Sequence, residues 1–141
     1  MRVQPYLFFD GRCEEALTFY QTALGAEILS MMRFKESPLP EESGVRPPGS
    51  DDKIMNASLR MGDSVLMVSD GRCGGNPEFK GVSLSITLHD AAEANRIFAA
   101  LAQGGEVLMP MTETFFAQRF GMVADRFGLS WLVLAAPVEG L

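Results

Sequence analysis

The chain has 141 residues, enough for one domain with a proper hydrophobic core and no disulfide or metal staple. Its 12 basic and 18 acidic side chains give a formal charge of −6, which argues against nucleic acid or an anionic membrane surface as the main partner. No apolar run is long enough to span a membrane, and the first residues lack the apolar stretch of a secretory signal. The two cysteines, Cys13 and Cys73, do not form a secreted disulfide framework, so we expect a cytoplasmic protein.

The first half of the chain predicts four strands and one helix. Apolar and aromatic runs favour the strands, helical spacing of apolar residues favours the helix, and Gly25 ends that helix. The turn Gly62-Asp63 is typical of a hairpin between the last two strands. The expected order is strand, helix and three strands. The strands are expected at Val3–Phe9, Ile28–Phe34, Lys53–Met61 and Ser64–Ser69, and Asp10-Gly11 is expected to open the helix.

Lys35–Asp52 interrupts this pattern. The segment contains four prolines and five acidic residues and shows no periodicity. A connection of this length is usually a functional or disordered loop, and we expect it to act as a flap-like loop.

The second half repeats the order of the first. Asp90 is expected to cap a helix whose buried stripe contains Ala94, Ile97, Phe98 and Leu101, and Gly104-Gly105 ends it. The strands are expected at Val82–Leu88, Glu106–Met109, Phe116–Ala124 and Ser130–Ala136.

These elements predict an α+β fold built from two βαβββ modules, which occupy about 1–70 and about 82–136 of a single domain, 1–141. Each sheet would have one wet face if it stood alone. Two such sheets bury those faces by forming a curved, partly open mixed β-barrel, with the helices outside and a cleft inside. A concave cleft of this kind is the default site for a small molecule.

The chain resembles the PhnB-like branch of the vicinal-oxygen-chelate superfamily, which includes glyoxalases, bleomycin-resistance proteins and dioxygenases. The resemblance rests on motifs along nearly the whole chain: Pro5–Gly11, Glu15–Tyr20, Leu24–Glu27, Met55–Leu59, Gly62–Asp70, Glu113–Ala117, Phe120-Gly121, and Asp125–Gly128 with Trp131. It implies this fold and a homodimer, but no particular substrate. Members of this branch often carry a methyltransferase-like name, yet no glycine-rich nucleotide loop follows the first strand here.

The resemblance also implies where a metal would bind. The ligand positions of catalytic members align with Gln4, Leu66 (or Met67), Ser83 and Leu132, of which glutamine alone is a usable ligand. Relatives often carry histidine where this chain has Asn56, and some carry one near Gln118; both residues are amides here. We therefore expect neither a metal nor a cofactor. The single histidine, His89, is expected at the surface or at a helix cap.

The candidate ligand-binding residues are those expected to line the cleft: Gln4, Tyr6, Phe8, Asn56, Ser58, Ser83, Ser85, Phe116, Gln118 and Trp131. Alternate residues of a strand point the same way, which groups Gln4 with Tyr6 and Phe8, and Ser83 with Ser85 and Thr87. Core packing is the alternative for the aromatic residues, and a solvated sheet face is the alternative for the serines.

The sequence is compatible with three functions. The first is metal-independent binding of a small, partly aromatic or apolar molecule. The second is an isomerase-like or lyase-like enzyme that uses Glu113 or Tyr6, provided that burial makes Glu113 a usable base. The third is a scaffold whose pocket is vestigial.

Overall fold

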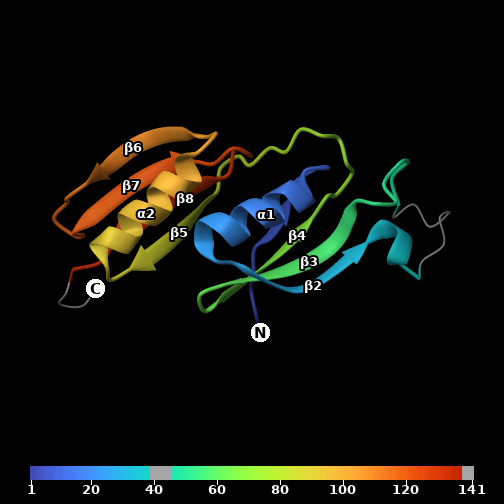
Figure 1. The fold of residues 1–141 in the computed structure, drawn as a ribbon, viewed down its shortest axis with the longest axis horizontal. Coiled ribbons are helices and arrows are strands. Elements are labelled where there is room, and N and C mark those ends of the chain that lie inside the picture. The colour runs from blue at the N-terminus through green and yellow to red at the C-terminus, as the bar shows by residue number, and fades with distance from the viewer. Residues whose placement is uncertain (39–45, 138–141) are drawn as a thin grey trace. The chain divides into compact units, whose positions relative to one another are not determined.

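The computed structural model describes residues 1–38 and 46–137, which divide into two compact units between Pro77 and Glu78. Each unit contains one helix and an open, four-stranded mixed sheet, in the predicted order βαβββ (Figure 1). The α+β class and the two-module architecture are therefore confirmed. The organisation as a single domain stays a prediction. No helix in the described part of the chain has the length and apolar character to span a membrane.

The first unit contains a sheet in which β1 lies at one edge and β2 at the other, in the order β1-β4-β3-β2. β1 pairs with β4 in parallel, and the remaining pairs are antiparallel. The elements are β1 (Tyr6–Phe8), α1 (Cys13–Leu24), β2 (Glu27–Arg33), a 3-10 turn (Phe34–Glu36), β3 (Ile54–Met61) and β4 (Ser64–Ser69).

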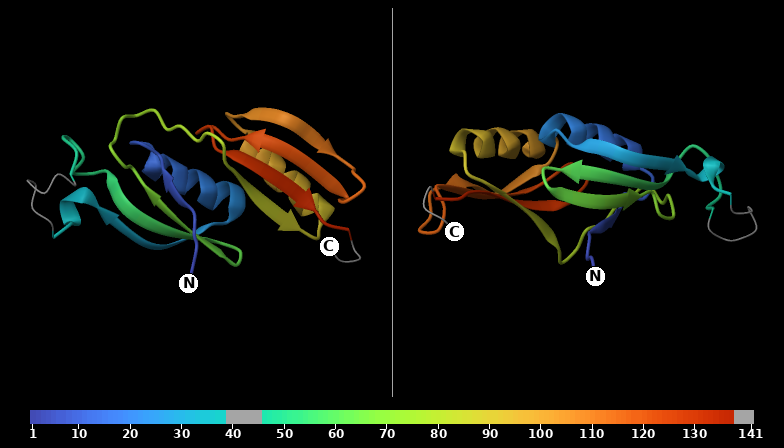
Figure 2. Two further views of the ribbon diagram at one scale, coloured as in Figure 1. Left: turned by 180° about the vertical axis from the view of Figure 1, so that it is seen from behind. Right: turned by 90° about the horizontal axis from the view of Figure 1, so that it is seen from below.

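Helix α1 lies over one face of this sheet (Figures 1 and 2). Its buried stripe repeats at helical spacing and consists of Cys13, Ala16, Leu17, Tyr20 and Ala23. Gly25 ends the helix in the left-handed conformation, with φ of 66°, as predicted. The helix start is capped from a distance, because the backbone N–H of Cys13 donates to Asp70 Oδ1 at 2.7 Å.

The second unit repeats the arrangement in the order β5-β8-β7-β6, with β5 parallel to β8. Its helix buries Ala94, Ile97, Phe98 and Leu101 as predicted, and Asp90 caps it by accepting from the N–H groups of Ala92 and Glu93. The elements are β5 (Ser83–Leu88), α2 (Ala91–Ala102), β6 (Glu106–Thr112), β7 (Arg119–Ala124) and β8 (Ser130–Ala135).

Strand β7 begins later than the predicted start at Phe116. A turn precedes it, in which the N–H of Thr114 donates to the carbonyl of Ala117 at 3.1 Å. That turn bends the chain before pairing with β8 begins. Strand β6 extends beyond the predicted end and includes Pro110, which is tolerated because β6 is an edge strand.

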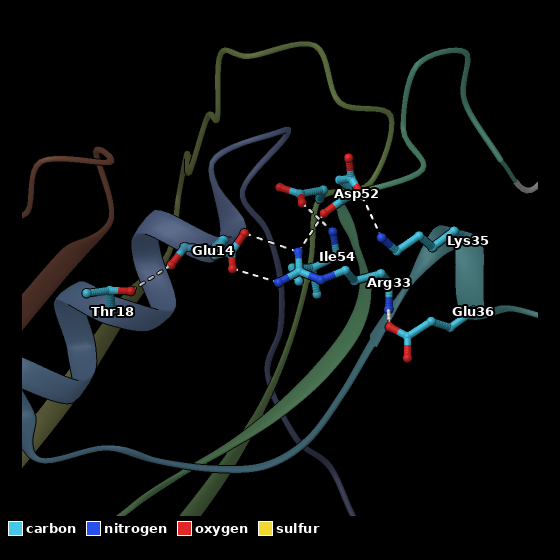
Figure 3. A network of polar contacts seen from close by, with 8 residues as sticks. Glu14, Thr18, Arg33, Lys35, Glu36, Asp52 and Ile54 are labelled. Atoms are coloured by element: carbon cyan, nitrogen blue, oxygen red, sulfur yellow. Dashed lines mark hydrogen bonds and ion pairs between the residues drawn. The ribbon is translucent and has the colours of Figure 1, made fainter.

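The ends of the predicted flap-like loop are held by a polar network (Figure 3). The guanidinium of Arg33 makes a bidentate pair with Glu14 of α1 at 3.1 and 2.7 Å, and it also donates to the carbonyl of Asp52. Lys35 pairs with the carboxylate of Asp52 at 2.8 Å. These contacts fix both stems of the loop against α1. Residues 39–45 of the loop lie outside the described residues.

Candidate ligand-binding site

Each module has one sheet face that its own helix covers and one that it leaves open. Side chains alternate between the two faces along every strand, and strand pairing continues each row across the sheet. In the first module Leu7, Ala57 and Val68 are buried on the α1 side. Their neighbours therefore form the opposite surface, which we call open face one. The strand register gives two central rows on this face. One row contains Tyr6, Met67, Ser58 and Ser30, and the other contains Phe8, Asn56 and Met32.

An aromatic pair lies at the β1 edge of open face one. The rings of Tyr6 and Phe8 are stacked, with centroids 5.0 Å apart and an interplanar angle of 23°. Phe8 also rests against Gly71, where an added Cβ would lie 3.1 Å from the ring. Tyr6 is 43% and Phe8 is 54% exposed, so both rings remain available to a ligand.

Asn56 and Ser58 lie beside this aromatic pair. The side-chain amide of Asn56 donates to the hydroxyl of Tyr6 at 2.9 Å, and the hydroxyl of Ser58 contacts the sulfur of Met67 at 3.7 Å. Gln4 precedes β1 and is half-buried, one residue before Pro5, whose carbonyl accepts from the N–H of Met67. The structure thus brings the predicted residues Tyr6, Phe8, Asn56 and Ser58 onto one surface.

Open face one is nearly free of charge. Of the side chains that the register places on it, Arg60 and Glu27 are charged, and they pair with each other at 2.6 Å. Their side chains are 48% and 61% exposed, so the pair adds little stability, but each charge is neutralised locally. The remaining polar groups on this face are hydroxyls and an amide, which orient a ligand without transferring protons near neutral pH.

Open face two, on the side of the second sheet away from α2, has a hydroxyl edge and an apolar centre. Ser83, Ser85 and Thr87 lie along β5, and Ser83 donates to the hydroxyl of Ser130 at 2.9 Å. Register places Leu132, Leu134, Met122 and Phe120 in the centre of the same face. Ser83 and Ser85 therefore lie on the same face of the sheet, as predicted.

A small aromatic cluster marks the start of β7. Phe116 meets Phe120 edge to face at 5.2 Å and Phe115 at 5.1 Å. Phe115 itself is almost fully exposed. The amide of Gln118 donates to the carbonyl of Ala136 at 2.7 Å, and its own backbone N–H donates to Ala135, so this side chain is held against the end of β8.

Three other residues singled out in the sequence lie elsewhere. Trp131 is 2% exposed on the α2 side of β8, where its indole N–H donates to Asp125 at 2.9 Å. Glu113 is exposed in the connection between β6 and β7. Its predicted use as a base required burial, and this condition is not met. His89 is exposed immediately before the helix cap Asp90.

The positions where the resemblance implies a metal do not fit a divalent cation in this chain. Leu66 is buried on the α1 side, and Met67 instead shares open face one with Tyr6. Ser83 and Leu132 lie on open face two. A leucine has no lone pair, and a neutral serine or thioether is a poor ligand for hard or borderline divalent metals. Among the described residues, no three His, Cys, Asp or Glu side chains cluster in a way that could hold a metal ion.

The two thiols are not activated. Burial raises the pKa of Cys13 strongly, and the nearby Asp70 and Glu14 carboxylates raise it further. Partial burial and Asp70 also raise the pKa of Cys73. A thiol with a raised pKa stays largely protonated near neutral pH, so both cysteines are poor nucleophiles there.

Several residues of the open faces were not among the predicted ligand-binding residues; they include Ser30, Met32, Met122 and Leu134. The signal that would have found the last two is the alternation of β8: once Leu132 is assigned to one face, Leu134 shares that face. Met122 then follows from antiparallel pairing with Leu132.

Comparison with known proteins places the chain in a family. The family model described as 3-demethylubiquinone-9 3-methyltransferase matches residues 1–134. Protein YjdN of Escherichia coli is 36% identical in an alignment 140 positions long, which covers 94% of each chain. The crystal structure of PA1353 from Pseudomonas aeruginosa is 40% identical and superposes with a TM-score of 0.83, covering 97% of this chain and 98% of that one.

Two further structures extend the comparison. The PhnB protein of Bacillus cereus is 28% identical with a TM-score of 0.76, covering 95% of this chain and 98% of that one. A glyoxalase/bleomycin resistance protein/dioxygenase from Nocardioides, at 17% identity, a TM-score of 0.60 and coverage of 99% and 85%, shares the fold. The chain therefore belongs to the PhnB-like 3-demethylubiquinone-9 3-methyltransferase family, and it shares its fold with a glyoxalase/bleomycin resistance protein/dioxygenase.

Proposed function

We propose that this protein binds a small, uncharged, partly aromatic molecule without a metal, on the open faces of its two sheets. The observation that carries the proposal is the ordered aromatic pair of Tyr6 and Phe8, which is left exposed beside neutral polar groups. Exposed aromatic rings held in a fixed geometry are costly to leave in water, and contact with a flat apolar molecule recovers that cost.

The chemistry of both faces supports an uncharged ligand. On open face one the charges of Arg60 and Glu27 neutralise each other. On open face two the hydroxyls of Ser83 and Ser85 flank an apolar centre around Leu132 and Met122. Small-molecule sites typically combine an apolar lining with a few convergent polar groups, which is the composition of these faces.

A catalytic role has weaker support. Glu113 lies exposed, and the thiols of Cys13 and Cys73 stay protonated. The methyltransferase named in the family description would need a site for a nucleotide-like methyl donor, and the sequence shows no glycine-rich loop after β1. We therefore propose binding rather than methyl transfer.

A thermal-shift screen tests the proposal. The protein is treated with EDTA and screened against flat, uncharged aromatic compounds, including quinoline and naphthalene. A compound present at a hundredfold excess over its dissociation constant stabilises the fold by about 2.7 kcal/mol, which raises the melting temperature by several degrees. Melting temperatures that stay unchanged across the whole set contradict the proposal.

A pair of phenylalanine variants locates the site. Phe8→Ala removes an exposed ring from open face one, and Phe115→Ala removes an exposed ring from the β6–β7 connection. We expect Phe8→Ala to weaken binding and Phe115→Ala to preserve it. The reverse result would place the ligand away from open face one.

We also propose that the chain forms a homodimer in the cytoplasm. The edge strands β2 and β6 expose apolar side chains, including Leu29, Met31, Val107 and Leu108, and exposed strand edges favour association. Both cysteines are free thiols, which suits a reducing compartment. Light scattering coupled to gel filtration tests the dimer, and a monomer mass at working concentration would contradict it.

A further inference from the structure

We infer that Tyr6 and Asn56 act as a specificity pair that recognises a hydrogen-bond acceptor, such as a ring nitrogen or a carbonyl oxygen, on a flat uncharged ligand. This inference rests on the proposed binding function and names the ligand chemistry that open face one selects. The contact that carries it is the hydrogen bond from Asn56 Nδ2 to the Tyr6 hydroxyl oxygen, at 2.9 Å.

The direction of this hydrogen bond decides what Tyr6 offers a ligand. A phenol has one proton to donate and an oxygen that accepts. Because Asn56 is the donor, the oxygen of Tyr6 accepts and the phenol's own proton is directed elsewhere. Within the part of the chain that the structure describes, no group accepts that proton, and Tyr6 is 43% exposed. The proton is therefore presented to whatever occupies open face one.

The phenol is also fixed in position. Its ring stacks on Phe8, and Phe8 in turn lies against the backbone of Gly71. Tyr6 pairs in register with Met67, whose sulfur is contacted by Ser58. A donor that is already oriented binds an acceptor with less loss of conformational entropy than a mobile side chain does.

The surroundings restrict the acceptor to an uncharged one. An anionic group would need a cation nearby, and Arg60, the cation on this face, is paired with Glu27 at 2.6 Å. Asn56 and Ser58 are neutral. The preferred ligand is thus a flat apolar molecule with a neutral acceptor atom at its rim, since the ring contacts Phe8 while the acceptor meets the Tyr6 hydroxyl.

Quinoline and naphthalene form a matched pair of probes for this inference. They have the same shape, and quinoline alone has a ring nitrogen that accepts a hydrogen bond; it is uncharged in mildly alkaline buffer. Affinities are measured by ligand-observed NMR titration of the full chain. We expect wild-type protein to bind quinoline about fivefold more tightly than naphthalene, the value of one ordinary hydrogen bond.

Three variants identify the donor. Tyr6→Phe removes the proton and should abolish the preference while retaining naphthalene binding. Asn56→Asp keeps the shape but replaces the amide donor by an acceptor, so the Tyr6 proton turns to Asp and the preference should again disappear. Tyr20→Phe removes the same hydroxyl from the other tyrosine of the chain, which is buried in α1, and should leave the preference intact.

The outcomes separate this inference from the proposed function. Equal binding of both probes by the wild type, or a preference that survives Tyr6→Phe or Asn56→Asp, overturns the specificity pair and leaves binding on open face one in place. Failure of both probes to bind overturns the binding function and the specificity pair together.

Discussion

Asp10 and Asp70 each hold the backbone of the segment that contains the other. The carboxylate of Asp10 accepts from the N–H of Gly74 at 2.7 Å, and that of Asp70 accepts from the N–H of Gly11 at 2.9 Å. Asp10 adopts a left-handed conformation with φ of 52°, which an aspartate tolerates better than most residues. This reciprocal clasp fixes the turn after β1 and therefore the end of the strand that contains Phe8.

We expect Asp70→Asn to destabilise the first module. Asp70 is fully buried, and besides Gly11 its carboxylate accepts from Cys13 and Ile54, both at 2.7 Å. An asparagine amide would direct N–H groups at one of these donors, which leaves buried groups unsatisfied and lowers the free energy of unfolding by about 2–3 kcal/mol. Urea denaturation measures the change.

The control for this variant is Asp63→Asn, which makes the same change in an exposed hairpin turn. Its unfolding midpoint should stay close to that of the wild type. Equal midpoints for the two variants would show that the clasp adds nothing to stability.

Trp131→Phe is expected to lower stability without changing ligand binding. The indole N–H donates to the buried carboxylate of Asp125, which also accepts from the N–H groups of Phe127 and Leu129. Removing the donor costs about 1–3 kcal/mol, because the carboxylate loses a partner in the core. Circular dichroism monitors unfolding, and NMR titration monitors quinoline binding. A folded variant with weakened quinoline binding would instead support the predicted role of Trp131 as a pocket wall.

The fold was predictable because its patterns are local. The buried stripe of α2, including Ile97 and Phe98, repeats at helical spacing, and the alternation of Ser83 with Leu84 marks β5 as a strand with two unlike faces. The duplicated order of elements then implies two similar modules. Strand ends were less predictable, since the turn that delays β7 depends on a backbone contact between Thr114 and Ala117.

The candidate site was predictable in part. Alternation along a strand groups Tyr6 with Phe8, but it does not show that Asn56 lies beside them, because that requires the register of β3 with β4 and of β4 with β1. Alternation also places Trp131 opposite Leu132, so the two cannot share one face. The capping role of Asp70 left no local signal, since its partners Gly11 and Cys13 are distant in sequence.

Gly105→Ala should be far more damaging than Gly62→Ala. A Cβ at Gly105 would collide with the carbonyl oxygen of Ala124 and approach the Cα of Asp125 to 3.0 Å, and backbone atoms cannot move aside without disturbing β6 and β7. We expect a loss of about 3 kcal/mol or more. Gly62 has open space around it, so alanine there adds only the strain of a left-handed backbone conformation, which lowers the free energy of unfolding by about 1–2 kcal/mol. Similar urea midpoints for the two variants would refute this ranking.

The thiol of Cys13 should make stability depend on alkaline pH. Burial, with Asp70 and Glu14 nearby, raises its pKa above the ordinary thiol value of about 8.5. Above that value the unfolded chain loses a proton that the folded chain keeps, so the free energy of unfolding falls by about 1.4 kcal/mol for each further pH unit. Cys13→Ala should therefore flatten the decline, and Cys73→Ala, at a partly exposed thiol, should flatten it less. Urea midpoints measured across the alkaline range test this, and parallel declines for wild type and Cys13→Ala would show that the buried thiol does not couple folding to pH.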